Sequence, residues 1–276
     1  MSTEPNSPGD AFADPARLWK QWHEARTEAV SGPYGPLALT GTHWIDDAAE
    51  GRIPAVPGRW AVSADGGEVI LTAGPEDGLA LDGAPFTGEA RLAADSGPTA
   101  ASRLAQGERR LVLLRRDGLW AVRVWDPASP ARQAFRGIET TPYDPRWSVP
   151  GRFTPYDPAA ARSVRVPNVD GVERELGLGG ELAFTLAGTD HTLQVTVEAD
   201  GSLWAVFADA TSGADSYRFR FLRPAAPDAD GRTTVDFNRT LLPPCALADH
   251  FLCPFPPPGN TLPLAIAAGE RNPVTG

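Results

Sequence analysis

Apolar and polar residues alternate along much of the C-terminal half of the chain, and turn residues separate the alternating runs. Residues 181–186 follow this pattern closely, as expected for a strand with one buried face. Runs of this kind recur at intervals of about ten residues, which is typical of a β-barrel or β-sandwich. We therefore predict strands at 164–166, 181–186, 193–197, 203–207 and 217–222.

Two hairpins are predicted in the N-terminal half of the chain. Residues 111–114 and 119–125 are apolar runs on either side of a turn that contains Asp117 and Gly118. An Asp-Gly pair between such runs is the strongest short-range signal for a hairpin. A second hairpin joins residues 60–62 to residues 69–71.

One α-helix is predicted near the N-terminus, at residues 15–30. Asp14 and Pro15 suit the start of a helix, and Ser31-Gly32-Pro33 suits its end. Apolar residues at helical spacing form one stripe, which we expect to pack over a sheet as a cover. The stripe consists of Leu18, Trp19, Trp22, Ala25 and Ala29.

The segment 235–270 is rich in proline and contains both cysteines of the chain. Proline neither donates to a strand ladder nor continues a helix, so we predict an ordered loop at 238–261. Strands at 235–237 and 262–266 are predicted on either side of it. An ordered loop of this length is usually functional.

These elements predict a mainly β fold: a single barrel-like or sandwich assembly of antiparallel strands with an N-terminal α-helix. Residues 1–13 are predicted to be a disordered tail, and residues 14–276 a single β-rich domain.

The formal charge of −10 argues against a nucleic-acid-binding protein, because such proteins need a basic face. Membrane attachment is not expected either, because no stretch approaches the ~20 apolar residues of a membrane span. The sequence shows no signal peptide, so the expected location is the cytoplasm, where cysteines are usually reduced. Oligomeric state cannot be read from the sequence.

Cys245, His250 and Cys253 are the first candidates for chemistry. Two thiolates and an imidazole can bind zinc, but this spacing matches no standard zinc motif. Three interpretations stay open: buried structural thiols, a disulfide, or a metal site. Buried thiols are favoured, so no metal and no cofactor is predicted.

The second candidate is a group of polar residues at the ends of predicted strands. Such side chains can bind a ligand, or they can cap turns and fasten loops. In the functional interpretation Arg239 binds an anionic group, Asp236 or Glu270 transfers protons, and Tyr217 and Asn260 orient the ligand. The complete set is Asp209, Thr211, Tyr217, Asp236, Asn238, Arg239, Asn260 and Glu270.

A third candidate is the loop expected between two copies of Pro-Tyr-Asp-Pro, at residues 142–145 and 155–158. Each copy is predicted to be a turn. The loop contains Arg146, Trp147, Arg152 and Phe153, which suit either ligand binding or a packed surface loop.

The leading hypothesis is that the protein binds a small polar or anionic ligand in a pocket under the 235–270 segment. The alternatives are an enzyme, a hydrolase or isomerase using Asp236, Tyr217 or Glu270, and a protein-interaction module using the proline-rich loop.

Several stretches of the C-terminal segment resemble a known family. They are Asp236-Phe237-Asn238-Arg239, Pro243-Pro244-Cys245, Cys253-Pro254, Asn260-x-Leu262 and Ala268-Gly269-Glu270. They resemble the domain-of-unknown-function family 1684, and the resemblance extends over about residues 19–270. It implies no reaction, because the family has none assigned. His250 departs from the pattern of the family, which has no regular histidine between the cysteines.

Overall fold

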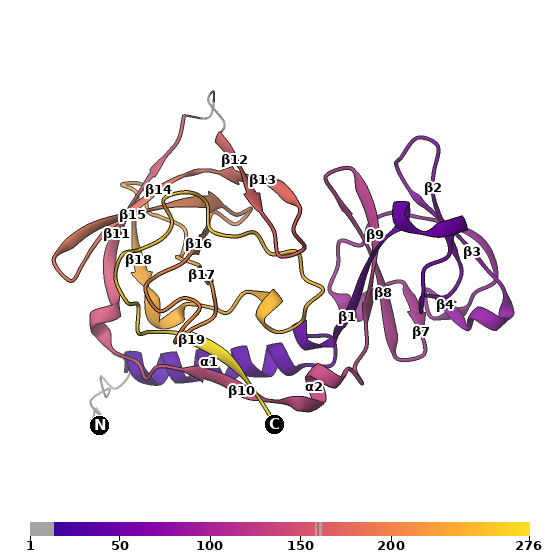
Figure 1. The fold of residues 1–276 in the computed structure, drawn as a ribbon, viewed down its shortest axis with the longest axis horizontal. Coiled ribbons are helices and arrows are strands. Elements are labelled where there is room, and N and C mark those ends of the chain that lie inside the picture. Colours follow the sequence, from indigo (N-terminus) through magenta and orange to yellow (C-terminus); the bar gives the residue numbers. More distant parts are fainter. Residues whose placement is uncertain (1–13, 158, 160–161) are drawn as a thin grey trace, which may run out of the picture. The chain divides into compact units, whose positions relative to one another are not determined.

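The computed structural model describes residues 14–157, 159 and 162–276, which form two compact units (Figure 1). Unit 1 contains residues up to Glu28, Ile138–Pro243 and Pro254–Asn272. Unit 2 contains Ala29–Gly137, Pro244–Cys253 and Pro273–Gly276. The tail predicted at residues 1–13 lies outside the described residues, and the single domain over 14–276 stays a prediction.

Unit 1 is built on a six-stranded sheet with the strand order β17-β16-β15-β14-β11-β18. Figure 1 shows this sheet curving part of the way around the core of the unit. Its paired strands are antiparallel. The bounds are β11 Ser148–Pro155, β14 Gly180–Leu186, β15 Thr189–Val197, β16 Leu203–Phe207, β17 Arg220–Leu222 and β18 Arg232–Asp236.

Period-two alternation explains which face of this sheet is buried. In β14, Leu182, Phe184 and Leu186 are buried, whereas the residues between them are exposed. The buried side chains pack against Phe207 of β16 and against Phe237, which follows β18. The inner face of the curved sheet is therefore filled with side chains.

Two smaller sheets complete the strands of the C-terminal half. Strand β12 (Arg162–Pro167) pairs with β13 (Glu173–Leu178) as an antiparallel hairpin. Strand β10 (Phe135–Thr140) pairs with β19 (Glu270–Thr275). Strands β10, β11, β13 and β19 are not among the predicted strands.

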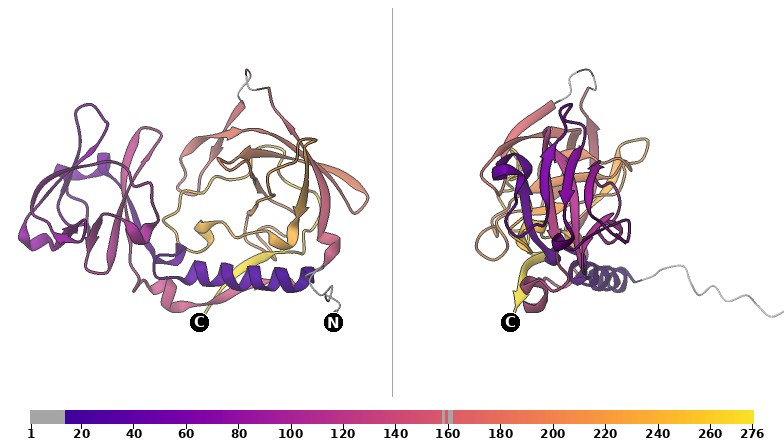
Figure 2. Two further views of the ribbon diagram at one scale, coloured as in Figure 1. Left: turned by 180° about the vertical axis from the view of Figure 1, so that it is seen from behind. Right: turned by 90° about the vertical axis from the view of Figure 1, so that its right-hand side faces the viewer.

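Helix α1 (Pro15–Ser31) confirms the predicted N-terminal helix, but its buried face differs from the predicted stripe. Leu18 is 42% exposed, and Ala25 and Ala29 are also exposed. The less exposed positions include Trp19, Trp22, His23, Arg26 and Val30, which follow helical spacing. Figure 2 shows α1 running beside β19, where Arg26 contacts Glu270.

Unit 2 contains a six-stranded sheet in the order β1-β9-β8-β7-β4-β5 and a three-stranded sheet in the order β2-β3-β6. Trp60, Leu71, Leu111 and Trp120 belong to its core. The bounds are β1 Leu39–Trp44, β2 Arg59–Val62, β3 Val69–Ala73, β4 Leu79–Leu81, β5 Ala84–Pro85, β6 Gly88–Leu92, β7 Leu104–Gln106, β8 Arg109–Arg116, β9 Leu119–Trp125 and α2 Pro130–Ala134.

Both predicted hairpins of this unit are confirmed. Strand β2 pairs with β3, and β8 pairs with β9. The β8–β9 turn has φ values of 52° at Asp117 and 83° at Gly118. Positive φ at both central residues is what a two-residue type I′ turn requires, and Asp-Gly tolerates it.

Two predictions for the C-terminal half are wrong. Residues 262–266 form no ladder strand, because Pro263 has no N–H to donate and Ile266 donates instead to the Asp209 carboxylate. Leu262 and Ile266 are nevertheless buried in the core, as a strand there would have required. The loop expected between residues 145 and 155 is largely strand β11.

The mainly β prediction with antiparallel strands and an N-terminal helix is confirmed. Within the described residues, no helix has the length and apolar character needed to cross a membrane.

Candidate functional site

Asp209 lies two residues after the end of strand β16, and its side chain is completely buried. One oxygen, Oδ1, accepts hydrogen bonds from the backbone N–H of Thr211 at 2.8 Å and from the hydroxyl of Thr211 at 2.7 Å. The other, Oδ2, is 2.7 Å from Nη2 of Arg220. Asp209 and Thr211, two predicted site residues, are therefore bonded to each other, and Asp209 also pairs with buried Arg220.

Arg220 of β17 is the partner that sequence reasoning missed. Its Nη1 donates to the carbonyls of Ala268 at 2.7 Å and Glu270 at 3.1 Å, and its Nη2 also donates to the carbonyl of Ile266 at 2.9 Å. Burial lowers the pKa of Arg220, and the charge of Asp209 offsets part of this effect. The planar guanidinium thus fixes a loop that has no ladder of its own.

The Ala268-Gly269-Glu270 stretch of the family resemblance has a structural explanation here. Gly269 has a φ of 71°, and a Cβ at this position would lie 2.7 Å from the carbonyl oxygen of Phe237. Its own carbonyl accepts a hydrogen bond from the Thr140 hydroxyl at 3.0 Å. Glycine is required by both the backbone conformation and the close approach.

Glu270 is a buried carboxylate whose two oxygens both have partners. Oε1 is 3.1 Å from Nε of Arg26 on α1, and Oε2 accepts a hydrogen bond from the N–H of Leu242 at 2.6 Å. The Glu270 side chain is 0% exposed and that of Arg26 is 20% exposed. This ion pair ties the helix to the end of the proline-rich segment.

Asp236, Asn238 and Arg239 lie together where β18 ends. Oδ1 of Asp236 accepts hydrogen bonds from the backbone N–H of Asn238 at 3.0 Å and from its amide at 2.9 Å. Oδ2 of Asp236 is 3.5 Å from Nε of Arg239, and the guanidinium lies 5.5 Å from the ring centre of Trp22. The Arg239 side chain is 44% exposed.

The side-chain amides of Asn238 and Asn260 each join separate segments. Asn238 accepts from the N–H of Asp144 at 3.0 Å and donates to its carbonyl at 3.0 Å. Asn260 forms the same pair of bonds with the backbone of Gln194, at 2.8 and 2.9 Å, and donates to the carbonyl of Val206 at 2.9 Å. Each amide accepts from a backbone N–H and donates to a backbone carbonyl, as a neighbouring strand would.

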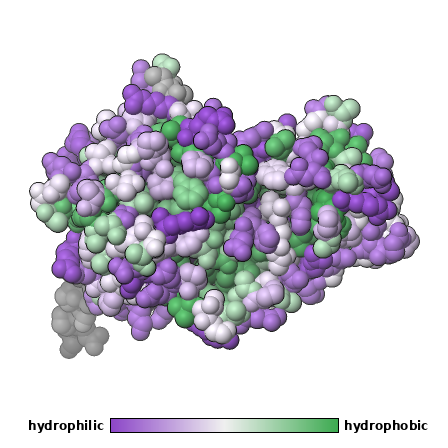
Figure 3. Space-filling view, in the orientation of Figure 1, coloured by the Kyte–Doolittle hydropathy of each residue, from purple (hydrophilic) through white to green (hydrophobic). Residues whose placement is uncertain are grey.

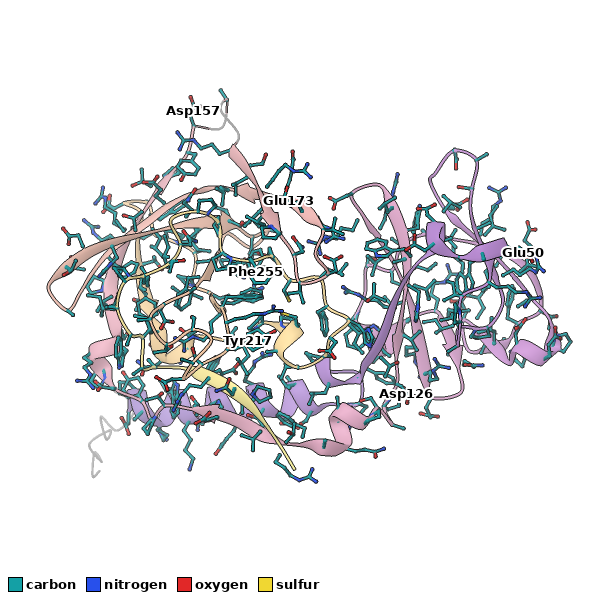
Figure 4. The ribbon with its side chains drawn as sticks, in the orientation of Figure 1. Glu50, Asp126, Asp157, Glu173, Tyr217 and Phe255 are labelled. Carbon is teal, nitrogen blue, oxygen red and sulfur yellow. The ribbon has the colours of Figure 1, made fainter. Side chains whose placement is uncertain are left out.

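Tyr217 belongs to a different cluster, which surrounds Arg218. The Arg218 guanidinium lies 5.5 Å from the ring centre of Tyr217, 5.8 Å from that of Phe219 and 4.8 Å from that of Phe255. Figure 4 shows Tyr217 and Phe255 near each other, and Phe255 comes from the proline-rich segment. We call these four residues the Arg218 platform.

Arg218 itself is exposed, and among the described residues none forms a hydrogen bond or ion pair with it. Figure 3 shows strongly hydrophilic residues among pale and green ones on the face of unit 1 that it displays. The platform thus offers guanidinium donors that no described residue uses.

Cys245 and Cys253 are buried in unit 2, and no disulfide joins them. The hydrogen bond between their thiols and their burial raise the pKa of Cys253 far above its usual value. The structure agrees with the interpretation as structural thiols, and no group of three potential ligands that could hold a metal occurs in the described residues.

The proline-rich segment also borders a cavity of about 310 Å³ in unit 2. Residues 246–250 line it together with Leu39, Thr40 and residues 129–131. His250 is among the lining residues, whereas none of the eight predicted ligand-binding residues is. Their role in ligand binding stays a prediction.

The structure therefore divides the predicted site into separate groups. Asp209 and Thr211 lie together, as do Asp236, Asn238 and Arg239. The residues that sequence reasoning missed are Arg26, Arg218 and Arg220. The sequence offered one signal for Arg220: it is a charged residue inside the apolar run formed by Phe219, Phe221 and Leu222.

Comparison with known proteins gives a family and a solved structure without an assigned activity. A family model described as a protein of unknown function (DUF1684) matches residues 133–271. An uncharacterized protein of Haloarcula marismortui, solved in solution by NMR, is 32% identical with a TM-score of 0.41; the match covers 50% of this chain and 77% of that one. No curated protein matches the chain.

Proposed function

Because the chain belongs to the DUF1684 family of proteins of unknown function, we propose a function from the geometry of unit 1 alone. The proposed function is binding of a small anionic molecule, a carboxylate or a phosphate ester, at the Arg218 platform. The observation that carries it is an exposed guanidinium that lies against three aromatic rings and has no hydrogen-bond partner among the described residues.

The rings hold the guanidinium without using its N–H groups. A cation over an aromatic face is stabilised by about 0.5–1 kcal/mol at an exposed site. Ring contacts also restrict the rotamers of Arg218 before a ligand arrives, so less entropy is lost on binding. The donors along the edge of the guanidinium match the two oxygens of a carboxylate or phosphate.

The other predicted groups are less suited to bind an anion or to transfer protons. Both oxygens of Asp209 and both of Glu270 have donors from the protein, and Arg239 has Asp236 beside it. An acid–base enzyme that used Glu270 would first have to break its bonds to Arg26 and Leu242. Buried Leu262 and Ile266 likewise give the proline-rich segment a role in the core, which favours the binding proposal over an interaction module.

A thermal-shift screen tests the proposal. Inorganic phosphate, succinate and glycerol 3-phosphate are added to the parent protein, and we expect at least one to raise the melting midpoint. A ligand at a hundredfold excess over Kd stabilises by about 2.7 kcal/mol. Arg218→Gln should abolish the shift, and Arg218→Lys should reduce it because an ammonium lacks the planar fork.

Two further variants act as controls. Arg223 is exposed and lies over a single ring, that of Trp204, at 5.8 Å. Arg223→Gln should retain the shift. Arg239→Lys distinguishes the two candidate arginines. If Arg239→Lys abolished the shift of the melting midpoint and Arg218→Gln retained it, the anion site would be at Arg239. If none of the three anions shifts the midpoint, the proposed function is wrong.

A further inference from the structure

A cavity of about 510 Å³ lies on the sheet of unit 1, among strands β11, β14, β15 and β18. Figure 1 shows these four strands together at one side of the unit. Since Leu182 and Phe184 point into the core, the residues that alternate with them lie on the opposite, outer face. The polar and small side chains that matter are Arg152, Ala183, Thr185, Asp190, Thr192 and Arg232.

Arg152 is the cationic group of this cavity. It lies opposite Ala183 on one neighbouring strand and opposite Arg232 on the other. Like charges directly opposite each other are unfavourable in a sheet. Arg232 forms ion pairs with Asp228 and Asp230, whereas none of the described residues bonds to the Arg152 side chain.

Asp190 is the anionic group of the same cavity. Its Oδ1 accepts a hydrogen bond from the Thr185 hydroxyl at 2.6 Å, and Oδ2 has no partner among the described residues. Both Arg152 and Asp190 are exposed. The cavity therefore has one unused group of each charge.

The pairing register gives the separation of these two groups. Arg152 is opposite Ala183, and Thr185, two residues further along β14, is opposite Asp190. Two strand spacings across and two residues along place the Cα atoms of Arg152 and Asp190 roughly 12 Å apart. Both residues line the cavity, and the β14 residues between them are Ala183, opposite Arg152, and Thr185, opposite Asp190.

We infer that this cavity binds a zwitterionic α-amino acid. The ligand carboxylate pairs with the guanidinium of Arg152, and its ammonium donates to Oδ2 of Asp190. An α-amino acid carries its carboxylate and its ammonium on one carbon. This suits a site with the cationic Arg152 and the anionic Asp190 on strands at either side of β14. The volume is at the scale of small-molecule sites, which are about 300–1,000 Å³. A simple anion would pair with Arg152 and leave Oδ2 of Asp190 unused.

The experiment is a thermal-shift titration of the full chain with the standard L-α-amino acids, followed by calorimetry for the one with the largest shift. That amino acid is compared with its N-acetyl and C-amide derivatives, each of which lacks one charge. We expect both derivatives to bind at least about tenfold more weakly. Arg152→Gln should weaken binding of the parent amino acid and leave binding of the C-amide unchanged. Asp190→Asn should weaken binding of the parent amino acid and leave binding of the N-acetyl derivative unchanged.

Arg165→Gln is the matched control, because Arg165 is an exposed arginine of unit 1 in an ion pair with Glu173 and does not line the cavity. Arg218→Gln separates this inference from the proposed function, since it should leave amino-acid binding unchanged. The inference is overturned if no amino acid shifts the midpoint, or if a derivative lacking one charge binds as tightly as the zwitterion.

Discussion

Asp209 and Arg220 show what one buried ion pair does at the scale of single residues. Every charged oxygen of Asp209 has a donor, and Arg220 extends the network to three carbonyls of the chain's last loop. Breaking such a pair leaves an uncompensated charge in the core, which costs far more than the pair itself contributes.

Asp209→Asn should therefore lower the free energy of unfolding by about 3–5 kcal/mol, because Arg220 stays buried and charged. Urea denaturation followed by tryptophan fluorescence measures this. The control is Asp82→Asn, which removes an exposed partner of Arg103, 2.7 Å away. Its effect should be much smaller, since water replaces the lost carboxylate. Equal losses in the two variants would contradict the role of the buried network.

The two thiols give a prediction of a different kind. Burial and mutual hydrogen bonding favour the protonated form of Cys253, whereas reaction with a disulfide reagent needs the thiolate. Native protein at neutral pH should react slowly with 5,5′-dithiobis(2-nitrobenzoate), and both thiols should react at once in denaturant. Rapid labelling of native protein would show that they are accessible, and no labelling in denaturant would show a disulfide.

At the scale of elements, helix α1 is held by polar contacts as much as by apolar ones. The indole N–H of Trp19 donates to the carbonyl of Asn238 at 2.7 Å, and Arg26 reaches Glu270 and the carbonyl of Leu242. Leu18, the first residue of the predicted stripe, is 42% exposed. The helix is therefore attached to unit 1 partly through polar groups, which a hydrophobic pattern does not identify.

Arg26→Met should lower the free energy of unfolding by about 3 kcal/mol, because it retains an apolar stem but leaves the Glu270 carboxylate with one donor. Leu18→Ala should change it by no more than about 0.5 kcal/mol. Differential scanning calorimetry of the two variants decides between a polar and an apolar attachment. A larger loss of stability for Leu18→Ala than for Arg26→Met would show that the predicted apolar stripe is the face that attaches the helix.

Elements with a local signal could be predicted from the sequence, and those with remote partners could not. The β8–β9 hairpin follows from alternation around Asp117-Gly118, which are neighbours in the chain. The buried face of α1 depends on Glu270, which is 244 residues away. Asp209 was recognisable as a polar residue among apolar ones, and Asn260 as a polar residue in the proline-rich loop. Such residues mark buried networks as well as binding sites, and only the positions of Arg220 and Gln194 tell the two apart.

At the scale of the whole molecule, neither unit is one continuous piece of chain. Unit 1 takes its helix from before Glu28 and its closing loop from Pro254–Asn272. The family match, residues 133–271, excludes α1 and with it Arg26, the ion-pair partner of Glu270. The matched segment is thus shorter than the set of residues that complete unit 1.

A fragment of residues 133–276 should consequently be less stable than the full chain. It lacks Trp19 and Arg26, so the carbonyl of Asn238 loses its indole donor and Oε1 of Glu270 loses its guanidinium donor. Urea denaturation monitored by circular dichroism should show an earlier or less cooperative transition. A midpoint equal to that of the full chain would mean that α1 contributes nothing to the stability of unit 1.

The distance along the chain between Arg26 and Glu270 also has a consequence for biosynthesis. Ribosomes add about 5–20 residues per second, so the 244 residues between these partners take roughly 10–50 seconds to make. During that interval the nascent helix carries Trp19 and Trp22 with no completed surface to cover them. We therefore expect helix α1 to need protection by chaperones until Glu270 has been synthesised.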